Sequence, residues 1–190
     1  MVWAAGAFAL PVQRWATVRR QRSAAVRTLD DPARLAAVQA VGSIAATTRA
    51  TLDDLARAIA GTFQAPSALV SILDDTEQHF PGQYGLGGGP AALACGGLPL
   101  DYSFCRFVVT SGEPLAIDNT LTHRLVRHHR ATTEWGVRSY LGVPLYGADG
   151  PIIGAVSAYD TFTHEWTEAA TEQMHGFARA AESILGSRPI

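Results

Sequence analysis

Two apolar segments in the carboxyl-terminal half constrain the fold of this chain more than any other feature. Residues 139–145 and 152–159 are rich in the aliphatic and aromatic side chains that favour strands. An Ala-Asp-Gly-Pro segment at 148–151 separates them, and its Asp and Gly are typical of a tight turn. We therefore expect an antiparallel hairpin, so at least part of the fold is an antiparallel sheet.

A second hairpin is expected earlier in the chain, where residues 69–73 and 78–80 flank the turn-forming pair Asp74-Asp75. Glycine dominates residues 82–97, and the pattern G-x-G-x-x-G fails there at Pro90. We interpret that segment as an irregular loop and not as a phosphate-binding site. A short helix at 103–109, a short strand at 115–118 and a part-helical polar segment at 121–135 are expected to follow.

Helical periodicity appears on both sides of the strand region. Asp31 and Pro32 are typical of a helix start, and Thr51 with Asp54 resembles a capping box that opens a second helix. A last helix is expected after Thr167, which would cap it. The apolar faces of these helices are, in order, Leu35, Val38, Val41 and Ile44; Leu52, Leu55, Ile59 and Phe63; and Ala170, Met174, Phe177, Ala181 and Ile184.

This order of elements indicates an α+β fold, with helices on one face of an antiparallel sheet. The apolar face of the last helix advances in steps of four and three, which suits packing on the domain's first helices or on a second copy. With 190 residues, 47% of them hydrophobic and 17% charged, the chain can bury the core of one globular domain. We assign residues 31–187 to this domain and residues 1–30 to an amino-terminal arm.

Charge is unevenly divided between the arm and the domain. Residues 1–30 contain five Arg and one acidic residue, whereas the rest contains ten Arg and sixteen acidic residues. The net charge of −2 provides no general field for nucleic acid. The apolar start of the arm is too short to span a bilayer and lacks the basic region of a signal peptide. We therefore expect a cytoplasmic protein, in which residues 1–22 offer a peripheral membrane contact.

Several motifs occur in the order found in one family. Segments 99–109 (PLDYSFCRFVV), 112–115 (GEPL) and 117–120 (IDNT) resemble the central signature of bacterial GAF domains. The resemblance continues through 136–145 (GVRSYLGVPL) to 158–160 (AYD) and 165–167 (EWT), and it covers residues 32–185. It implies a six-stranded antiparallel sheet with helices on one side, a ligand pocket on the other, and dimerisation through terminal helices. The ligand and any cofactor stay unknown, because the family binds cyclic nucleotides, haem, tetrapyrroles or small metabolites.

Cys95 and Cys105 flank the entry to the expected central helix. Their spacing resembles that in free methionine-(R)-sulfoxide reductases, GAF-fold enzymes with a third cysteine whose approximate position here falls at 127–130 (RHHR). Three alternatives are open: inert or pocket-lining cysteines, a reversible Cys95–Cys105 disulfide, and the chemistry of a degenerate reductase.

Most candidate binding residues lie in these motifs, and Tyr84 and Trp135 are added as aromatic residues with a polar group. Aromatic side chains suit the walls of an apolar pocket, and Asp118 either faces that pocket or caps the following turn. His123, His128 and His129 lie close together, but they form no metal-binding pattern, so we expect a solvated loop and no metal site. The candidate ligand-binding residues are Tyr84, Phe104, Cys105, Asp118, Trp135, Tyr140 and Tyr159.

The leading interpretation is a sensory or regulatory domain that binds a small molecule and acts through a homodimer or a protein partner that carries the output. One alternative is a thiol-based redox switch, or a degenerate reductase, that uses Cys95 and Cys105. A second alternative is a ligand-free dimerisation scaffold whose pocket is filled by its own aromatic side chains.

Overall fold

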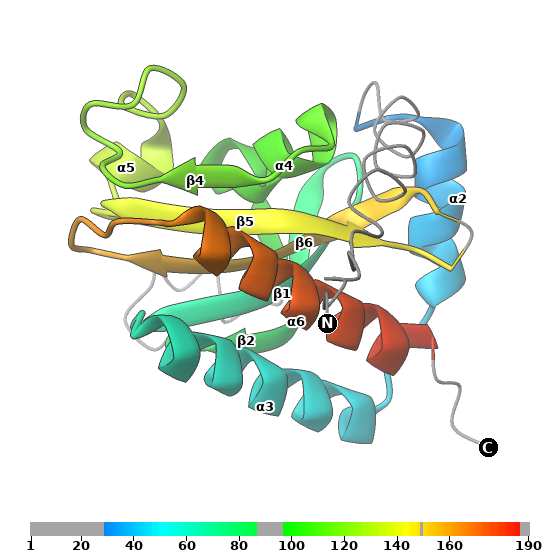
Figure 1. Ribbon diagram of the computed structural model, residues 1–190. Helices are drawn as coiled ribbons and strands as arrows, with labels where there is room; N and C mark the ends of the chain where they lie inside the picture. Colours follow the sequence, from blue (N-terminus) through cyan, green and yellow to red (C-terminus); the bar gives the residue numbers. More distant parts are fainter. Residues whose placement is uncertain (1–28, 87–96, 149, 187–190) are drawn as a thin grey trace, which may run out of the picture.

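The computed structural model describes residues 29–86, 97–148 and 150–186 of the chain. Six strands form one antiparallel sheet in the order β3-β2-β1-β6-β5-β4 (Figure 1). The strands are β1 (Ser67–Leu73), β2 (Glu77–Tyr84), β3 (Gly97–Pro99), β4 (Leu115–Ile117), β5 (Ser139–Tyr146) and β6 (Ile152–Asp160). Both expected hairpins are confirmed, because β1 pairs with β2 and β5 pairs with β6.

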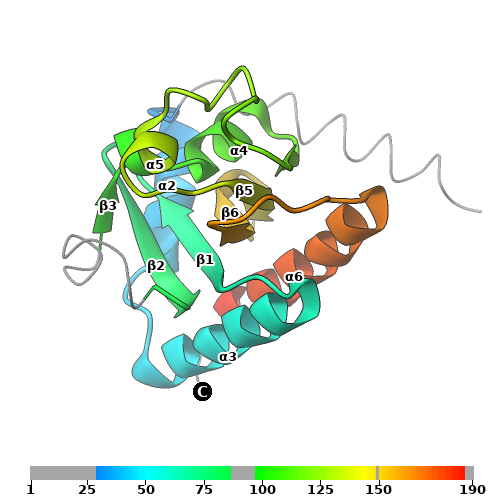
Figure 2. The same ribbon diagram turned by 90° about the vertical axis from the view of Figure 1, so that its left-hand side faces the viewer.

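The two faces of the sheet are covered differently. Helices α3 (Ala46–Phe63) and α6 (Glu168–Gly186) cover one face, as the expected α+β fold requires (Figure 2). The short helices α4 (Cys105–Ser111) and α5 (Arg130–Thr133) lie over the other face with their connecting loops (Figure 2). Because both faces are covered, β1, β5 and β6 are buried almost throughout and do not alternate between buried and exposed residues.

Helix α3 starts earlier than the sequence suggested. Its first residue is Ala46, so the prediction of a capping box at Thr51 and Asp54 is wrong. Inside the helix, the Thr51 hydroxyl donates to the carbonyl oxygen of Thr47, 3.0 Å away, and it caps nothing. The first turn of α3 is mostly exposed, and the buried residues of the helix begin at Leu52.

Helix α6 begins as expected and uses its apolar face within the domain. The Thr167 hydroxyl accepts a hydrogen bond from the amide of Ala170 at 3.1 Å, which is the geometry of an amino-terminal cap. Met174 and Ala181 are fully buried in the core cluster shared by α3, α6 and the sheet, and Phe177 packs against it. Of the two partners suggested for this face, the structure therefore shows the domain's own core.

Strand β2 extends beyond the expected hairpin. It reaches Tyr84, which pairs with Ala68 of β1, so the glycine-rich loop starts later than the sequence indicated. Gly82 allows this extension, because a Cβ at that position would come within 2.6 Å of the Leu52 Cβ on α3. The short helix expected at 103–109 is present as α4, and it ends where Gly112 takes a φ of 70°.

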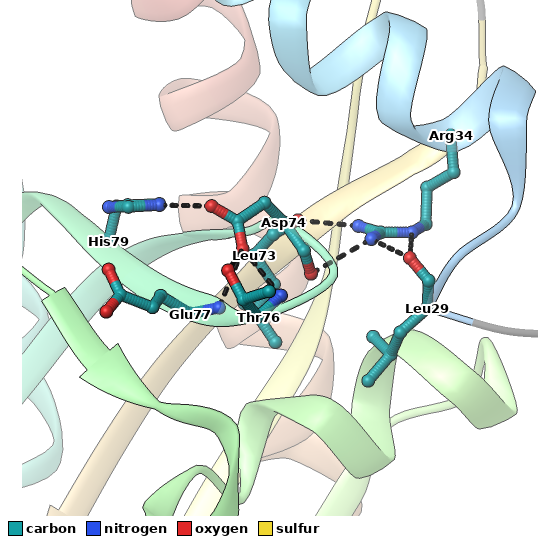
Figure 3. A network of polar contacts seen from close by, with 7 residues as sticks. All are labelled: Leu29, Arg34, Leu73, Asp74, Thr76, Glu77 and His79. Carbon is teal, nitrogen blue, oxygen red and sulfur yellow. Dashed lines mark hydrogen bonds and ion pairs between the residues drawn. The ribbon is translucent and has the colours of Figure 1, made fainter.

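Helix α2 (Pro32–Val41) begins at the expected residue, where Asp31 Oδ1 accepts the amide of Arg34 at 2.9 Å. Arg34 itself is buried, which the helical periodicity did not predict. Its guanidinium donates to the carbonyl oxygens of Leu29, Leu73 and Asp74 (Figure 3). The bonds to Leu73 and Asp74 attach α2 to the turn between β1 and β2. They also give the carbonyl groups hydrogen-bond partners within the protein.

Asp74 organises the same turn with its side chain (Figure 3). Its carboxylate accepts the amides of Thr76 and Glu77, at 2.7 and 2.6 Å, and contacts His79 Nε2 at 2.6 Å. Partial burial acts to raise the pKa of Asp74, but the hydrogen bonds from His79, Glu77 and Thr76 outweigh it and hold the pKa well below its ordinary value.

The basic arm lies almost wholly outside the described residues, so its contact with a membrane stays a prediction. Within the described part of the chain, no helix combines the length and the apolar character needed to cross a bilayer.

Candidate ligand-binding site

A cavity of about 610 Å³ lies on the sheet face opposite α3 and α6. Side chains of β1 alternate between the two faces of the sheet. Ala68, Val70 and Ile72 face the helices, whereas Ser67 and Leu69 line the cavity. The volume suits a small organic ligand. The lining residues are Pro66, Ser67, Leu69, Gln78, Phe80, Gly85, Leu86, Leu98, Tyr102, Ser103, Phe104, Cys105, Ala131, Glu134, Trp135, Val137, Tyr140, Tyr159 and Thr161.

Cys105 lies at the start of α4 and contacts polar groups from four strands. Its Sγ lies 3.3 Å from the Tyr140 hydroxyl and 3.4 Å from Gln78 Nε2, both of which donate to the sulfur. Ser157 Oγ lies 3.8 Å from Sγ and Ser71 Oγ lies 4.0 Å away. Since these residues belong to β5, β2, β6 and β1 in that order, Cys105 joins α4 to the centre of the sheet.

The surroundings of Cys105 do not favour thiol chemistry. The side chain is 2% exposed, and burial raises the pKa of its thiol despite the hydrogen bond from Tyr140. A nucleophilic cysteine needs a thiolate and access to its substrate. The position of Cys105 at the start of α4 and its hydrogen bonds favour a thiolate, but burial outweighs the hydrogen bonds and the pKa stays raised. Cys95, the second member of the expected pair, lies outside the described residues.

The other polar groups beneath the cavity are partnered among themselves. Gln78 Nε2 donates to Ser71 Oγ at 2.8 Å, and Gln78 Oε1 accepts the hydroxyl of Ser103. Ser67 donates to the carbonyl oxygen of Gly85 at 3.0 Å. These buried side chains, which we call the polar floor of the cavity, thus have hydrogen-bond partners within the protein.

A stacked aromatic pair lines the cavity, with Tyr102 from the 3-10 helix η2 (Leu100–Tyr102) and Trp135 from the segment just after α5. The rings of Tyr102 and Trp135 have centroids 4.5 Å apart and planes inclined by 15°. The Tyr102 hydroxyl donates to Glu134 Oε2 at 2.8 Å, and Arg130 Nε donates to Glu134 Oε1 at 2.8 Å. The Arg130 guanidinium also lies 4.1 Å from the centre of the Tyr102 ring.

Glu134 is the one charged side chain among the described residues that line the cavity. The hydrogen bond from Arg130, followed by the one from Tyr102, lowers the pKa of Glu134 below its ordinary value. Its charge is therefore retained at neutral pH and compensated by Arg130 beside it.

His129 packs against Phe104, one of the residues that line the cavity. Its ring lies 4.8 Å from the Phe104 ring and 5.5 Å from the Phe107 ring, and its Nδ1 accepts the amide of Ala131 at the start of α5. Burial, together with the nearby Arg106, lowers the pKa of His129, so the ring is neutral at pH 7. In the described ranges, no group of three His, Cys, Asp or Glu side chains is placed to hold a metal ion.

The structure brings five of the seven candidate ligand-binding residues to the cavity: Phe104, Cys105, Trp135, Tyr140 and Tyr159. The other two lie elsewhere. Tyr84 is 40% exposed at the end of β2, with the Arg57 guanidinium 5.7 Å from its ring centre. Asp118 Oδ1 accepts the amide of Trp166 at 2.9 Å, so its side chain ties the end of β4 to the segment before α6.

Sequence reasoning missed other lining residues, chiefly Gln78, Tyr102, Ser103 and Glu134. Tyr102 and Ser103 belong to the same motif as Phe104 and Cys105, and that neighbourhood was a usable signal. Gln78 and Glu134 gave none, because a polar residue in a strand or in a charged loop is normally solvated.

The family model described as GAF domain matches residues 47–185. No curated protein matches the chain. The GAF domain of an Acinetobacter phosphoenolpyruvate-protein phosphotransferase is similar in structure, with a TM-score of 0.59, 15% identity, and coverage of 82% of this chain and 94% of that one. The free methionine-R-sulfoxide reductase of Neisseria meningitidis, solved with its substrate, has a TM-score of 0.57 at 19% identity, covering 94% and 95%.

The blue-light absorbing form of the Thermosynechococcus elongatus PixJ GAF domain is also similar, with a TM-score of 0.57, 16% identity, and coverage of 73% of this chain and 84% of that one. The descriptions of these three proteins differ: a domain of a phosphotransferase, a reductase and a light-absorbing domain. At such identities the likeness shows the fold alone.

Proposed function

Because the chain belongs to the GAF domain family, we propose that it is a sensory or regulatory domain that binds a small organic molecule in the cavity above its sheet. The observation that carries this proposal is the cavity of about 610 Å³, walled by aromatic side chains and floored by a partnered polar network. Mostly apolar cavities of this size are the usual form of ligand sites.

The arrangement also supports a route by which an occupied cavity acts on a partner or a second copy. Tyr140 and Tyr159 line the cavity and pair with each other across β5 and β6. The opposite sides of these strands, at Leu141 and Ala158, pack in the core cluster that includes α6. A displacement of the two strands by a ligand would therefore reach α6, the terminal helix on the far face.

A thermal-shift screen of metabolites tests the proposal. A ligand at a hundredfold excess over its Kd should raise the Tm by roughly 5–10 °C, because it binds only the native state. Thr161→Trp places a large ring at the cavity and should abolish the shift. Thr163→Trp, at an exposed position that does not line the cavity, is the matched control and should keep it. A broad screen with no shift on folded protein would contradict the proposal.

Neither alternative function is favoured by the residues in the structure. A ligand-free scaffold needs a pocket filled by its own side chains, whereas this one encloses about 610 Å³. A thiol switch or reductase needs a reactive sulfur, whereas Cys105 is buried and its pKa is raised.

A further inference from the structure

We propose that the ligand is a flat, uncharged aromatic compound whose ring stacks on Trp135, adding a layer to the pair that Trp135 forms with Tyr102. This inference rests on the proposed function, since it specifies what the same cavity binds. It follows from the geometry of the aromatic pair and from the balance of charge around it.

The Tyr102–Trp135 pair is fixed before any ligand arrives. Tyr102 is held by its hydrogen bond to Glu134 and by the guanidinium of Arg130 near its ring. Arg130 is held in turn by two contacts with Glu134, at 2.8 and 3.3 Å. Because these contacts restrain Tyr102, little ordering remains to be done when a third ring is added to the stack.

Of the two stacked rings, Trp135 has fewer contacts with neighbouring rings and cations. The ring of Tyr102 is in contact with both Trp135 and Arg130. Among the described residues, Trp135 stacks with Tyr102 alone, and it lines the cavity. We therefore place the planar ring of the ligand against the Trp135 indole, on the side turned away from Tyr102.

The balance of charge disfavours ionic ligands at this position. Glu134 is the one charged side chain in the described lining, and Arg130 already compensates it. An anionic ligand would meet no free cation in this lining, and a cationic one would have to compete with Arg130. Neither gains an ion pair that offsets its lost hydration.

The polar floor leads to the same conclusion. Gln78 and Ser103 use their hydrogen-bonding groups on each other and on Ser71. A ligand with many polar substituents would have to break these bonds to be satisfied. A ring compound that relies on stacking and apolar contact leaves them intact.

A charge series with one shared ring tests the inference at neutral pH. The probes are indole, which is neutral, tryptamine, which is cationic, and indole-3-acetate, which is anionic. Binding is followed in ¹⁵N-labelled protein through the side-chain Nε–H signal of Trp135, which Trp135→Phe identifies by its loss. We expect indole to shift this signal and to bind at least about tenfold more tightly than either charged probe.

Variants separate stacking from general apolar contact. Trp135→Ala should weaken indole binding about tenfold, whereas Trp135→Phe should retain most of it because a ring remains, with the backbone signals of the wall reporting in these variants. Phe162→Ala removes an aromatic ring that is 75% exposed outside the cavity, and it should leave the affinity unchanged.

Three results would overturn the inference: no binding of indole, a charged probe that binds as tightly as indole, or a Trp135→Ala affinity equal to that of the unaltered protein. The proposed function fails separately. If a charged probe binds and Thr161→Trp abolishes its binding, the cavity is a ligand site and only the inference about its ligand is wrong. If the metabolite screen finds nothing, the function itself is wrong.

Discussion

At the scale of single residues, Cys105 belongs both to the cavity and to the frame of the sheet. Its sulfur meets polar groups of β1, β2, β5 and β6 from the first residue of α4. Burial keeps the thiol protonated, so the sulfur acts as a small, polarisable packing group. Cys105 therefore lines the cavity and, through its contacts with the sheet, also holds α4 in place.

Thiol labelling checks this description of Cys105. In a Cys95→Ser background, Cys105 is the single thiol of the chain. We expect dithionitrobenzoate to modify it very slowly in the native protein at pH 7 and rapidly in denaturant, because burial blocks access and raises the thiol pKa. Fast labelling of the folded protein would show an exposed, activated thiol and would revive the redox interpretation.

At the scale of elements, the turn between β1 and β2 is a joint between the sheet and α2. The Asp74 carboxylate accepts two backbone amides of the turn and contacts His79, while its carbonyl oxygen accepts Arg34 (Figure 3). The three-residue turn at 74–76 thus depends on one acidic side chain, and α2 is attached to that turn through Arg34.

The lowered pKa of Asp74 makes this joint sensitive to acid. Since the folded pKa lies below the unfolded value of about 3.9, the stabilisation is complete above that value and is lost as the pH falls through the folded pKa. Urea unfolding between pH 7 and pH 3 should show the stability advantage of the unaltered protein over Asp74→Asn shrinking with falling pH. Asp75→Asn, on the exposed neighbour, is the matched control for the removal of one carboxylate. A difference for Asp74→Asn that stays constant across this range would contradict the prediction.

At the scale of the whole molecule, the sheet has a buried core cluster on each face, and the cavity lies on the face of α4 and α5. The side under α3 and α6 is closed by Leu52, Ile59 and Met174, all fully buried, whereas the cavity occupies the side of α4 and α5. One sheet therefore carries the α3–α6 core on one face and the cavity on the other. The apolar face of α6 belongs to the α3–α6 core.

Substitution of Met174 tests this division. Met174→Ala should lower the free energy of unfolding by about 2–5 kcal/mol, because the side chain is fully buried and leaves a void. The oligomeric state, followed by light scattering, should match that of the unaltered protein. Gln173→Ala, exposed on the same helix, should change stability by less than about 0.5 kcal/mol. A changed oligomeric state at unaltered stability would place the apolar face of α6 between two copies.

The sequence alone was sufficient for most elements and for the class of fold. The turn at Gly150, the cap at Thr167 and the helix start at Asp31 are all present where expected. Each depends on chemistry within a few residues of the chain, through strand propensity, capping or periodicity. The ordered family motifs contain four of the five predicted lining residues, because those motifs lie on elements that surround the cavity. The fifth, Trp135, was predicted from its aromatic side chain.

Only the tertiary structure decided how these elements use their side chains. Cys105 meets Gln78, Ser71, Tyr140 and Ser157 across sequence separations of 27, 34, 35 and 52 residues, so its burial could not be predicted from its neighbours in the sequence. Arg34 is buried for the same reason, since its acceptors Leu73 and Asp74 come from a distant turn. Such contacts depend on the order of strands in the sheet, which the periodicity of a single segment does not encode.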